Sequence, residues 1–256
     1  MASAYRLPRL SRAEPRNSTG ARLLPFVDHP YESIDILLDR PPKLDLRSHQ
    51  DKMIAGGRGG YCFEQNMLFR GGRRSLGYKV TSLQARVVRG LEIDAPRPML
   101  HMVPRIDLPR GPFLADVGFG NLAPTAPLRL SPGVEQDTPH EVMRFIAMED
   151  ELTLQSRLGD RGEHIYRVVL LPRFDAEYEI CNWFTGTHPQ SPYLNNMIAA
   201  LPGPNRTRLS RSTRGSMFDT LQEKSNVARS KAWTSIGPCC GMCSGSHCPM
   251  KICEPP

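Results

Sequence analysis

Hydrophobic and polar positions divide the chain into a helical first part and a strand-rich second part. Before Gly77, apolar residues recur at helical spacing, which predicts helices over residues 29–38, 44–54 and 62–70. After Gly77 the chain consists of short alternating or β-branched runs that are separated by Pro, Gly and Asp. These runs predict strands over residues 78–88, 99–106, 113–119, 142–148, 151–157 and 165–171. Such a series is typical of an antiparallel sheet or barrel.

The pattern is less regular beyond Pro172. Ser191 followed by Pro192 is a typical helix start, so we expect one further helix over residues 191–201. With 256 residues, the chain is long enough for one large domain or two to three small ones with real cores.

Composition narrows the class of protein without identifying it. The net charge is +7, which by itself allows a nucleic-acid binder, a plain basic surface or a site for a small polyanion. No nucleic-acid recognition motif is present, so we expect no nucleic-acid partner. No apolar run reaches the ~18 residues of a membrane span, and the first residues lack the apolar core of a secretory signal. We therefore expect no membrane association and a cytoplasmic location.

The chain has seven cysteines, an odd number that argues against a disulfide framework in a cytoplasmic protein. Cys181 lies in an apolar stretch and is interpreted as a core residue. The end of the chain holds a set of residues with enough ligands for zinc: Cys240, Cys243, His247, Cys248 and Cys253. Their spacing matches no standard zinc finger or ribbon, so we interpret the tail as a divergent terminus and expect no metal site.

The segment RGGYCFEQN at residues 58–66 carries the strongest chemical signal. Its cysteine, Cys62, follows a Gly-Gly turn and begins a predicted helix. Backbone N–H groups and the helix dipole at that position favour a thiolate, which is the form of cysteine that acts as a nucleophile. Taken alone, Cys62 is more readily interpreted as an inert buried cysteine, so a nucleophile assignment needs a base nearby.

A base and an acid stand in two neighbouring predicted strands. His101 lies in one strand and Asp116 in the next, with DLPRGP at 107–112 as the hairpin between them. A turn centred near Pro109–Arg110 places residue 116 opposite residue 103, which makes Asp116 a diagonal neighbour of His101. With Cys62 they form the nucleophile, base and orienting carboxylate of covalent catalysis. A structural His–Asp pair on a barrel wall is the alternative.

These segments together resemble the arylamine N-acetyltransferase family. That family combines an RGG-x-C-x-E segment, a histidine in a strand and a D-V-G-F-G segment, and the chain has all three in order. PYESIDILL resembles the family's PFENLD stretch, with Tyr31 and Ser33 where Phe and Asn are usual. NWFTGTHPQSPYLNNMIAA at 182–200 is similar to the family's NWY-STHP segment. The resemblance covers about residues 23–209.

The resemblance implies an α+β fold with a helical N-terminal bundle, an antiparallel β-barrel and an α/β lid around a cysteine-protease-like Cys-His-Asp core. Residues 1–77 correspond to the helical domain and residues 78–172 to the barrel. Residues 173–256 correspond to an interdomain segment and an incomplete or divergent lid. The sequence departs from the family at Gly71 and Gly72, which stand where the family has a continuous helix. Each glycine inside a helix costs about 1 kcal/mol relative to alanine.

Roles for individual residues also follow from the resemblance. It implies that Cys62 is the acetylated nucleophile, His101 its base and Asp116 the orienting carboxylate. His188 is assigned to substrate or cofactor binding, with a simple turn residue as the alternative. The other implied positions are an aromatic-substrate contact (Phe119), the loop beside the acetyl-CoA channel (Gly118 and Gly120) and a supporting pair beside the site (Arg58 and Glu32).

The implied activity is transfer of an acetyl group from acetyl-CoA, the co-substrate, to arylamines or arylhydrazines in xenobiotic metabolism. The reaction would be ping-pong, through an acetyl-cysteine intermediate and without a metal. Two alternatives stay open: a catalytically impaired relative with divergent termini, and a transglutaminase-like cysteine hydrolase that uses the same three residue types. A homodimer is left open as well.

Overall fold

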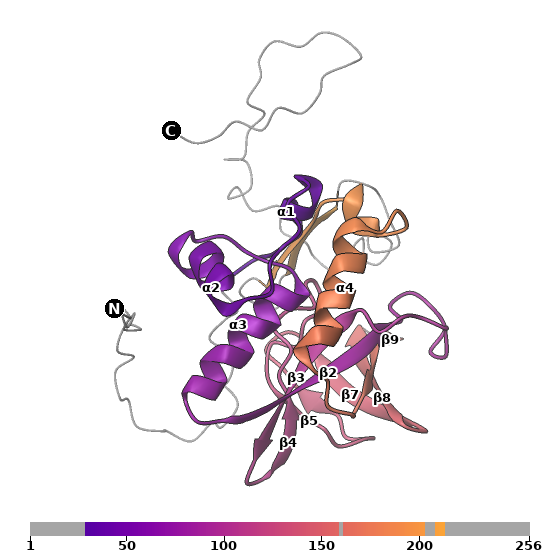
Figure 1. Ribbon diagram of the computed structural model, residues 1–256. Coiled ribbons are helices and arrows are strands. Elements are labelled where there is room, and N and C mark those ends of the chain that lie inside the picture. The colour runs from indigo at the N-terminus through magenta and orange to yellow at the C-terminus, as the bar shows by residue number, and fades with distance from the viewer. Residues whose placement is uncertain (1–28, 159–160, 203–207, 213–256) are drawn as a thin grey trace.

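The first described part of the chain is helical, with one short strand before the helices. The computed structural model describes residues 29–158, 161–202 and 208–212 (Figure 1), so the zinc-ligand candidates of the tail lie outside the described residues. The elements are β1 (Tyr31–Glu32), α1 (Ile34–Leu37), α2 (Leu46–His49), the π-helix η2 (Gln50–Ala55) and α3 (Cys62–Ser75). The predicted helices are confirmed, although β1 shortens the first one.

Helix α3 is longer than the predicted 62–70 and continues through Gly71 and Gly72 to Ser75. All of its residues from Cys62 to Arg70 are buried, and the helix packs against strands β2 and β3 of the barrel. Tertiary packing of this kind supplies most helical stability in proteins, so it outweighs the glycine cost.

Eight strands form a nearly closed antiparallel barrel; the barrel was predicted, although only six of its strands were. They are β2 (Lys79–Val87), β3 (His101–Leu108), β4 (Gly111–Leu114), β5 (Leu128–Arg129), β6 (Gln136–Asp137), β7 (Val142–Met148), β8 (Glu151–Leu158) and β9 (Arg161–Val169). Their order in the sheet is β5-β4-β3-β2-β9-β8-β7-β6. The predicted strand 113–119 is too long: β4 ends at Leu114, because farther along the Val117 N–H donates to Asn66 Oδ1 of α3 at 3.0 Å.

The two end strands of this sheet are joined by one side chain. Gln136 of β6 accepts a hydrogen bond of 2.7 Å from the Arg129 N–H of β5, and its Nε2 donates to Arg129 O at 2.9 Å. The Gln136 amide thus takes the place of a backbone ladder at the seam of the barrel.

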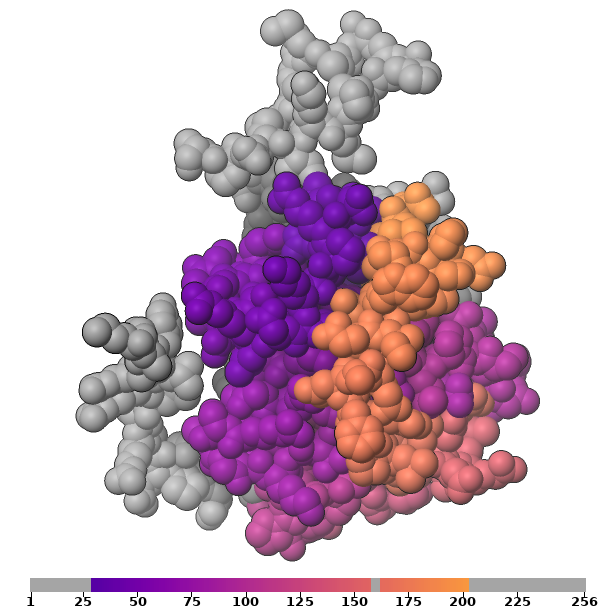
Figure 2. All heavy atoms as spheres, viewed as in Figure 1, coloured from indigo at the N-terminus to yellow at the C-terminus, as the bar shows by residue number. Residues whose placement is uncertain are grey.

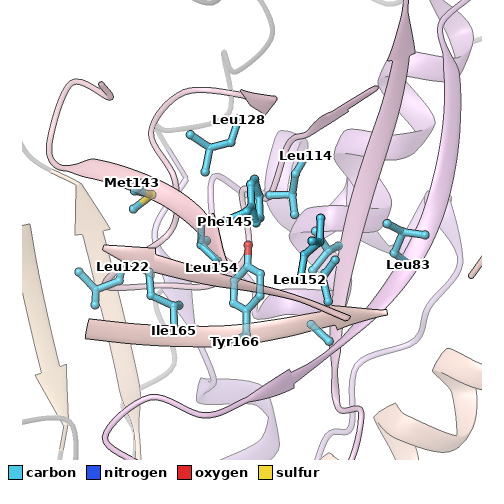
Figure 3. Close-up of a cluster of buried hydrophobic side chains, with 13 residues drawn as sticks. Leu83, Leu114, Leu122, Leu128, Met143, Phe145, Leu152, Leu154, Ile165 and Tyr166 are labelled. Atoms are coloured by element: carbon cyan, nitrogen blue, oxygen red, sulfur yellow. The ribbon is translucent and has the colours of Figure 1, made fainter. Parts of the chain in front are cut away.

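The barrel interior is filled with apolar side chains from the alternating positions of its strands. Figure 3 shows Leu83, Leu114, Phe145, Leu154 and Tyr166 within this cluster, and each of them is fully buried. Burying a side chain such as Leu or Phe contributes about 1.5–3 kcal/mol. The packed interior therefore gives β3 a rigid position, and His101 is the first residue of that strand.

The last described part adds a helix and two strands. Helix α4 (Asp175–Thr187) was not predicted, and the predicted helix 191–201 is wrong. The 3₁₀ turn η3 (Pro192–Leu194) is followed by strand β10 (Ile198–Pro202), which pairs with β1 and with β11 (Arg208–Ser212). Ser191 does cap the turn, since its Oγ accepts from the Tyr193 N–H, but pairing with β1 imposes an extended backbone on the residues after it.

Helix α4 lies against both other parts of the molecule. In Figure 2 its orange residues border the indigo and purple helical part on one side and the magenta barrel on the other. Tyr178 donates from its hydroxyl to Leu83 O of β2 at 2.9 Å, and Asn182 Nδ2 donates to Pro42 O at 2.8 Å. The architecture is therefore α+β, as expected. Among the described residues, none of the helices has the length and apolar character needed to cross a bilayer.

Candidate functional site

The β3–β4 hairpin brings His101 and Asp116 together. Its register pairs Leu108 with Gly111 and Arg105 with Leu114, so the turn is centred between residues 109 and 110, as predicted. Extending that register places residue 116 opposite residue 103. Asp116 Oδ2 lies 2.7 Å from His101 Nε2, and both side chains are buried. The diagonal contact predicted from the sequence is confirmed.

Cys62 is the first residue of α3, where the helix begins beside the barrel. Glu64 fixes this helix start, because its Oε2 accepts a hydrogen bond of 3.0 Å from the Tyr61 N–H. Lys52 Nζ in turn donates to both Glu64 oxygens, at 2.8 and 3.0 Å. The segment that presents Cys62 is thereby held by a buried carboxylate with its own cation.

The predicted pair of Arg58 and Glu32 is present and belongs to a larger ionic cluster. Arg58 Nη2 donates to Glu32 Oε1 at 2.8 Å, and its Nη1 donates to Asp35 Oδ1 at 2.7 Å. Lys52 Nζ lies 2.6 Å from Asp35 Oδ2 as well. The cluster connects α1, η2 and the loop before Cys62.

Asn66 joins the helix to the His–Asp pair. Its Nδ2 donates to Asp116 Oδ1 at 2.9 Å and to Met102 O at 2.8 Å, and its Oδ1 accepts from the Val117 N–H. Asn66 comes four residues after Cys62, so it lies on the same face of α3 one turn later. The sequence analysis did not select Asn66, although this spacing was visible in it.

Cys62 and His101 open onto one pocket with an empty volume of about 590 Å³. The predicted residues Gly118, Phe119 and Gly120 line the same pocket. The Phe119 ring packs edge-on against His101, with ring centroids 5.2 Å apart. Further lining residues are Tyr31, Val87, Arg89, Leu100 and Tyr193. Six of the sequence-selected residues are thus gathered here, if Asp116 behind the His101 ring is included.

Gly118 is required by the close approach of its loop to α3. A Cβ at this position would lie 2.7 Å from Asn66 Nδ2 and 2.8 Å from Cys62 O, distances that no side chain tolerates. Gly120 has a φ of +84°, and a Cβ there would meet the Tyr31 ring at 3.2 Å. Both glycines therefore allow the loop after Asp116 to pass directly beside Cys62.

His188 lies elsewhere. It ends α4, stacks on Phe184 with ring centroids 4.3 Å apart, and is not among the described residues that line this pocket. Its assignment to substrate or cofactor binding stays a prediction.

The free thiol of Cys62 is not acidified by its position. Burial raises the pKa of Cys62 above its usual range, and the negative charge of Asp116 adds to the rise. A hydrogen bond from the Phe63 N–H acts in the opposite direction, which is the helix-start effect expected from the sequence. Because burial outweighs that effect, the thiol needs a partner that accepts its proton.

The Asp116 carboxylate stays ionised. Burial alone would raise its pKa, but the charge of His101 and hydrogen bonds from His101, Asn66 and the Gly118 N–H hold the pKa below its usual value. An ionised carboxylate only accepts hydrogen bonds, so His101 Nε2 carries the hydrogen that is shared with Asp116. In the neutral form of the ring, Nδ1 is therefore the nitrogen that carries the lone pair.

Tyr166 is a second residue that the sequence analysis missed. Its ring lies 5.2 Å from both His101 and Phe119, and it belongs to β9 on the opposite part of the barrel wall from β4. Burial raises the pKa of its hydroxyl well above the usual range. No local pattern along the chain selects it, because its place beside His101 depends on the pairing of β2 with both β3 and β9.

Comparison with known proteins identifies the family to which this chain is similar. A family model described as N-acetyltransferase matches residues 26–230. The match continues past residue 209, so the limit drawn from the sequence resemblance was too short.

Two relatives give the extent of the similarity. An arylamine N-acetyltransferase from Mycobacterium tuberculosis is 37% identical over 176 residues, which are 67% of this chain and 62% of the relative. One from Escherichia coli is 34% identical over 180 residues, which are 70% of this chain and 64% of the relative. The chain thus spans less than two thirds of the length of these relatives.

The fold is similar to solved structures over a comparable range. The Mycobacterium marinum arylamine N-acetyltransferase in complex with CoA superposes with a TM-score of 0.69 at 35% identity, covering 72% of this chain and 69% of that one. The structure of the M. tuberculosis protein gives a TM-score of 0.69, also at 35% identity.

Proposed function

Because the chain belongs to the arylamine N-acetyltransferase family, we propose that it transfers an acetyl group from acetyl-CoA to the nitrogen of arylamines or arylhydrazines. The observation that carries this proposal is the 2.7 Å contact of His101 with Asp116 beside a pocket that also exposes Cys62. The solved M. marinum relative in complex with CoA supports acetyl-CoA as the co-substrate. In this proposal Cys62 is the nucleophile, His101 the base and Asp116 the carboxylate that orients it.

The first half of the reaction charges the enzyme. His101 Nδ1 takes the proton of the Cys62 thiol, which the raised pKa of that thiol makes necessary. The Cys62 sulfur then forms a bond to the carbonyl carbon of the thioester. When the bond between that carbon and the CoA sulfur breaks, His101 returns its proton to the departing thiolate. The products are acetyl-Cys62 and coenzyme A.

The second half transfers the acetyl group. An arylamine nitrogen is neutral at pH 7, so its lone pair attacks the carbonyl carbon of acetyl-Cys62 directly. His101 Nδ1 accepts the proton that this nitrogen loses, the carbon–sulfur bond breaks, and the Cys62 sulfur recovers a proton from His101. The Phe63 N–H, which donates to the Cys62 sulfur, is a candidate donor for the negative oxygen of each tetrahedral intermediate.

The remaining residues of the site are assigned supporting roles. Phe119 provides an aromatic face for the ring of the acceptor, since it stands edge-on to His101 in the pocket. Gly118 and Gly120 let the backbone approach both Cys62 and the acetyl donor. Arg58 and Glu32 keep the loop before Cys62 in place.

The broader setting belongs to the same proposal. We assign the protein to the cytoplasm and to the modification of xenobiotic amines, without a metal. The division into residues 1–77, 78–172 and 173–256 is proposed as the domain organisation. The described residues contain no group of three or more His, Cys, Asp or Glu side chains placed to hold a metal ion.

Intact mass after incubation with acetyl-CoA tests the proposal. The full chain should gain the mass of one acetyl group, located on Cys62 by peptide mapping, and an aromatic hydrazine should then remove it. His101→Ala should prevent the gain, whereas the matched control Cys181→Ser should retain it. A cysteine hydrolase of the transglutaminase type would show no acetylation by acetyl-CoA, and that result would reject the proposal.

A further inference from the structure

Two tyrosine hydroxyls meet at the pocket that Cys62 and His101 line. Tyr31 comes from β1 and Tyr193 from the turn η3, far apart in the sequence. Their hydroxyl oxygens lie 2.8 Å apart, so one of them donates a hydrogen bond to the other. Both side chains line the pocket, and both pack in the hydrophobic cluster that contains Cys62. The chemistry proposed so far gives neither hydroxyl a role.

The pair has one O–H hydrogen left over. Each tyrosine hydroxyl is a single donor, and only one of the two hydrogens is used between Tyr31 and Tyr193. Within the part of the chain that the structure describes, neither hydroxyl has another hydrogen-bond partner. Hydrogen bonds in a chain polarise one another, so the first bond makes the second hydroxyl a better donor. The remaining hydrogen is therefore available to a group that binds in the pocket.

Packing of the two rings holds the pair beside Cys62. The Tyr193 ring packs edge-on against the ring of Tyr61, with centroids 6.3 Å apart, and Tyr61 directly precedes Cys62. The Tyr31 ring lies over Gly120, where a Cβ would meet it at 3.2 Å. Both rings thus rest on segments that adjoin the sulfur, one before it in the chain and one in the loop that passes next to it.

The two hydroxyls keep their protons and are affected by charge on the sulfur. Burial raises the pKa of Tyr31, and negative charge on Tyr193 and on Cys62 adds to the rise. Burial also raises the pKa of Tyr193, again with a contribution from charge on Cys62. The pair is therefore not a base, but it is a protonated donor in a place where negative charge near the sulfur is felt.

We propose that the Tyr31–Tyr193 hydroxyl pair donates its remaining hydrogen bond to the acetyl oxygen that becomes negative in each tetrahedral intermediate. This inference rests on the proposed acetyl transfer and adds a second donor to the Phe63 N–H. When the Cys62 sulfur bonds to the carbonyl carbon, the π electrons of the C=O bond move to the oxygen. The hydroxyl stabilises that charge without giving up its proton, and the electrons re-form the C=O bond when the intermediate collapses.

The first test follows the first half-reaction alone, so that no acceptor is present. Rapid quenching and intact mass give the rate at which acetyl-CoA forms acetyl-Cys62 on the full chain. Replacing the tyrosine that contacts the oxygen, by Tyr31→Phe or Tyr193→Phe, should slow this step about 100-fold. Replacing the tyrosine that acts through it should slow the step about 10-fold, and the double variant should be no slower than the worse single one. Unchanged rates in both single variants would overturn the proposal.

Alkylation by iodoacetamide separates this role from a structural one. The sulfur attacks a saturated carbon in that reaction, so no negative oxygen forms. Alkylation of Cys62 should therefore stay within about 2-fold in Tyr31→Phe and Tyr193→Phe. Equal slowing of alkylation and acetylation would make the tyrosines structural residues, and the proposal would fail.

Tyr178→Phe is the matched control for both rates. It removes a tyrosine hydroxyl of the same hydrophobic cluster, which donates to Leu83 O instead of lining the pocket. The rates of acetylation and of alkylation should both hold in this variant. If it slowed acetylation as much as Tyr31→Phe and Tyr193→Phe do, loss of any buried hydroxyl would explain the result, and the proposal would fail.

The acetyl group itself reports the contact. In acetyl-Cys62 made from acetyl-CoA with an isotopic label at the carbonyl carbon, a donated hydrogen bond lowers the infrared frequency of the C=O band. Tyr31→Phe or Tyr193→Phe should shift this band to higher frequency, and an identical band in all three proteins would overturn the proposal. A rate loss confined to the second half-reaction would place the hydroxyls on the acceptor and would also overturn it. Failure of the unaltered chain to form acetyl-Cys62 would instead reject the proposed function.

Discussion

Cys62 and Cys181 are both buried thiols of the same hydrophobic cluster, yet only Cys62 lines the pocket that His101 also lines. They are 6% and 9% exposed, and burial raises the pKa of each. Cys62 begins α3 in the pocket that His101 lines. Cys181 lies in the middle of α4, where its sulfur accepts from Gln84 Nε2 at 3.2 Å and faces Met99 O at 3.3 Å. Burial therefore does not distinguish the proposed nucleophile from a core cysteine, whereas a pocket shared with an imidazole does.

The largest expected effect comes from exchanging each sulfur for oxygen. Cys62→Ser should lower the acetyl-transfer rate by at least about 10⁴-fold, because the hydroxyl is a much weaker nucleophile in the same place. Cys181→Ser should stay within about 3-fold of the unaltered protein. Steady-state kinetics with one aromatic hydrazine measures both variants. Comparable losses in the two would show that the cysteines do not differ in the way described.

Removing the base should make Cys62 behave like Cys181. In the unaltered protein, alkylation of Cys62 by iodoacetamide should be fast and nearly independent of pH around pH 7, since His101 accepts the proton. In His101→Ala the rate at pH 7 should fall about 100-fold. The raised pKa leaves that thiol protonated, so its rate should then climb about tenfold per pH unit as the pH increases.

Cys181 supplies the reference for this experiment within the same samples. Peptide mapping after timed alkylation gives both rates, and the Cys181 rate should show the same steep rise with pH before and after the substitution. A Cys62 rate that His101→Ala leaves unchanged would contradict the role of the imidazole.

The smallest of the three effects concerns two side-chain amides. Asn66 lies one helical turn after Cys62, and Gln84 donates to the Cys181 sulfur. Asn66→Leu removes partners of Met102 O, Asp116 and the Val117 N–H, so the free energy of unfolding should fall by about 3 kcal/mol. Gln84→Leu removes a weak bond to the Cys181 sulfur and should cost about 1 kcal/mol or less. Urea denaturation compares the two. Equal costs would mean that Asn66 holds the site no more firmly than Gln84 holds the core.

The barrel and the His–Asp contact were predictable from sequence because they depend on local patterns. Alternation of polar and apolar residues identifies a strand with one buried face, and the short segment 107–112 fixes the register of its hairpin. His101 and Asp116 follow from that register alone. Cys62 follows from a glycine turn before a helix.

The structure of residues 173–202 was not predictable in the same way. Residues 198–202 form a strand because β1, far away in the sequence, offers a pairing edge to them. Without that partner, Ser191 and Pro192 indicate a helix start equally well. Helix α4 was missed because its outer face exposes large apolar side chains, including Ile180 and Trp183, and this blurs the amphipathic pattern.

Residues that support the site from a distance were also beyond the sequence. Arg89 lines the pocket and Tyr166 packs against His101 only after β2 has paired with β3 and β9, so no spacing along the chain relates them to Cys62. Asn66 is the exception, since a position one helical turn after a nucleophile always lies on its side of the helix.

The Gln136 amide at the barrel seam has a consequence for strand addition at that seam. Strands β5 and β6 are only two residues long, and an unbridged strand edge is a template onto which another chain can add its own strand. Gln136 already forms hydrogen bonds with the N–H and C=O of Arg129, which an added strand would need. One glutamine thus keeps two sheet edges from recruiting a neighbour.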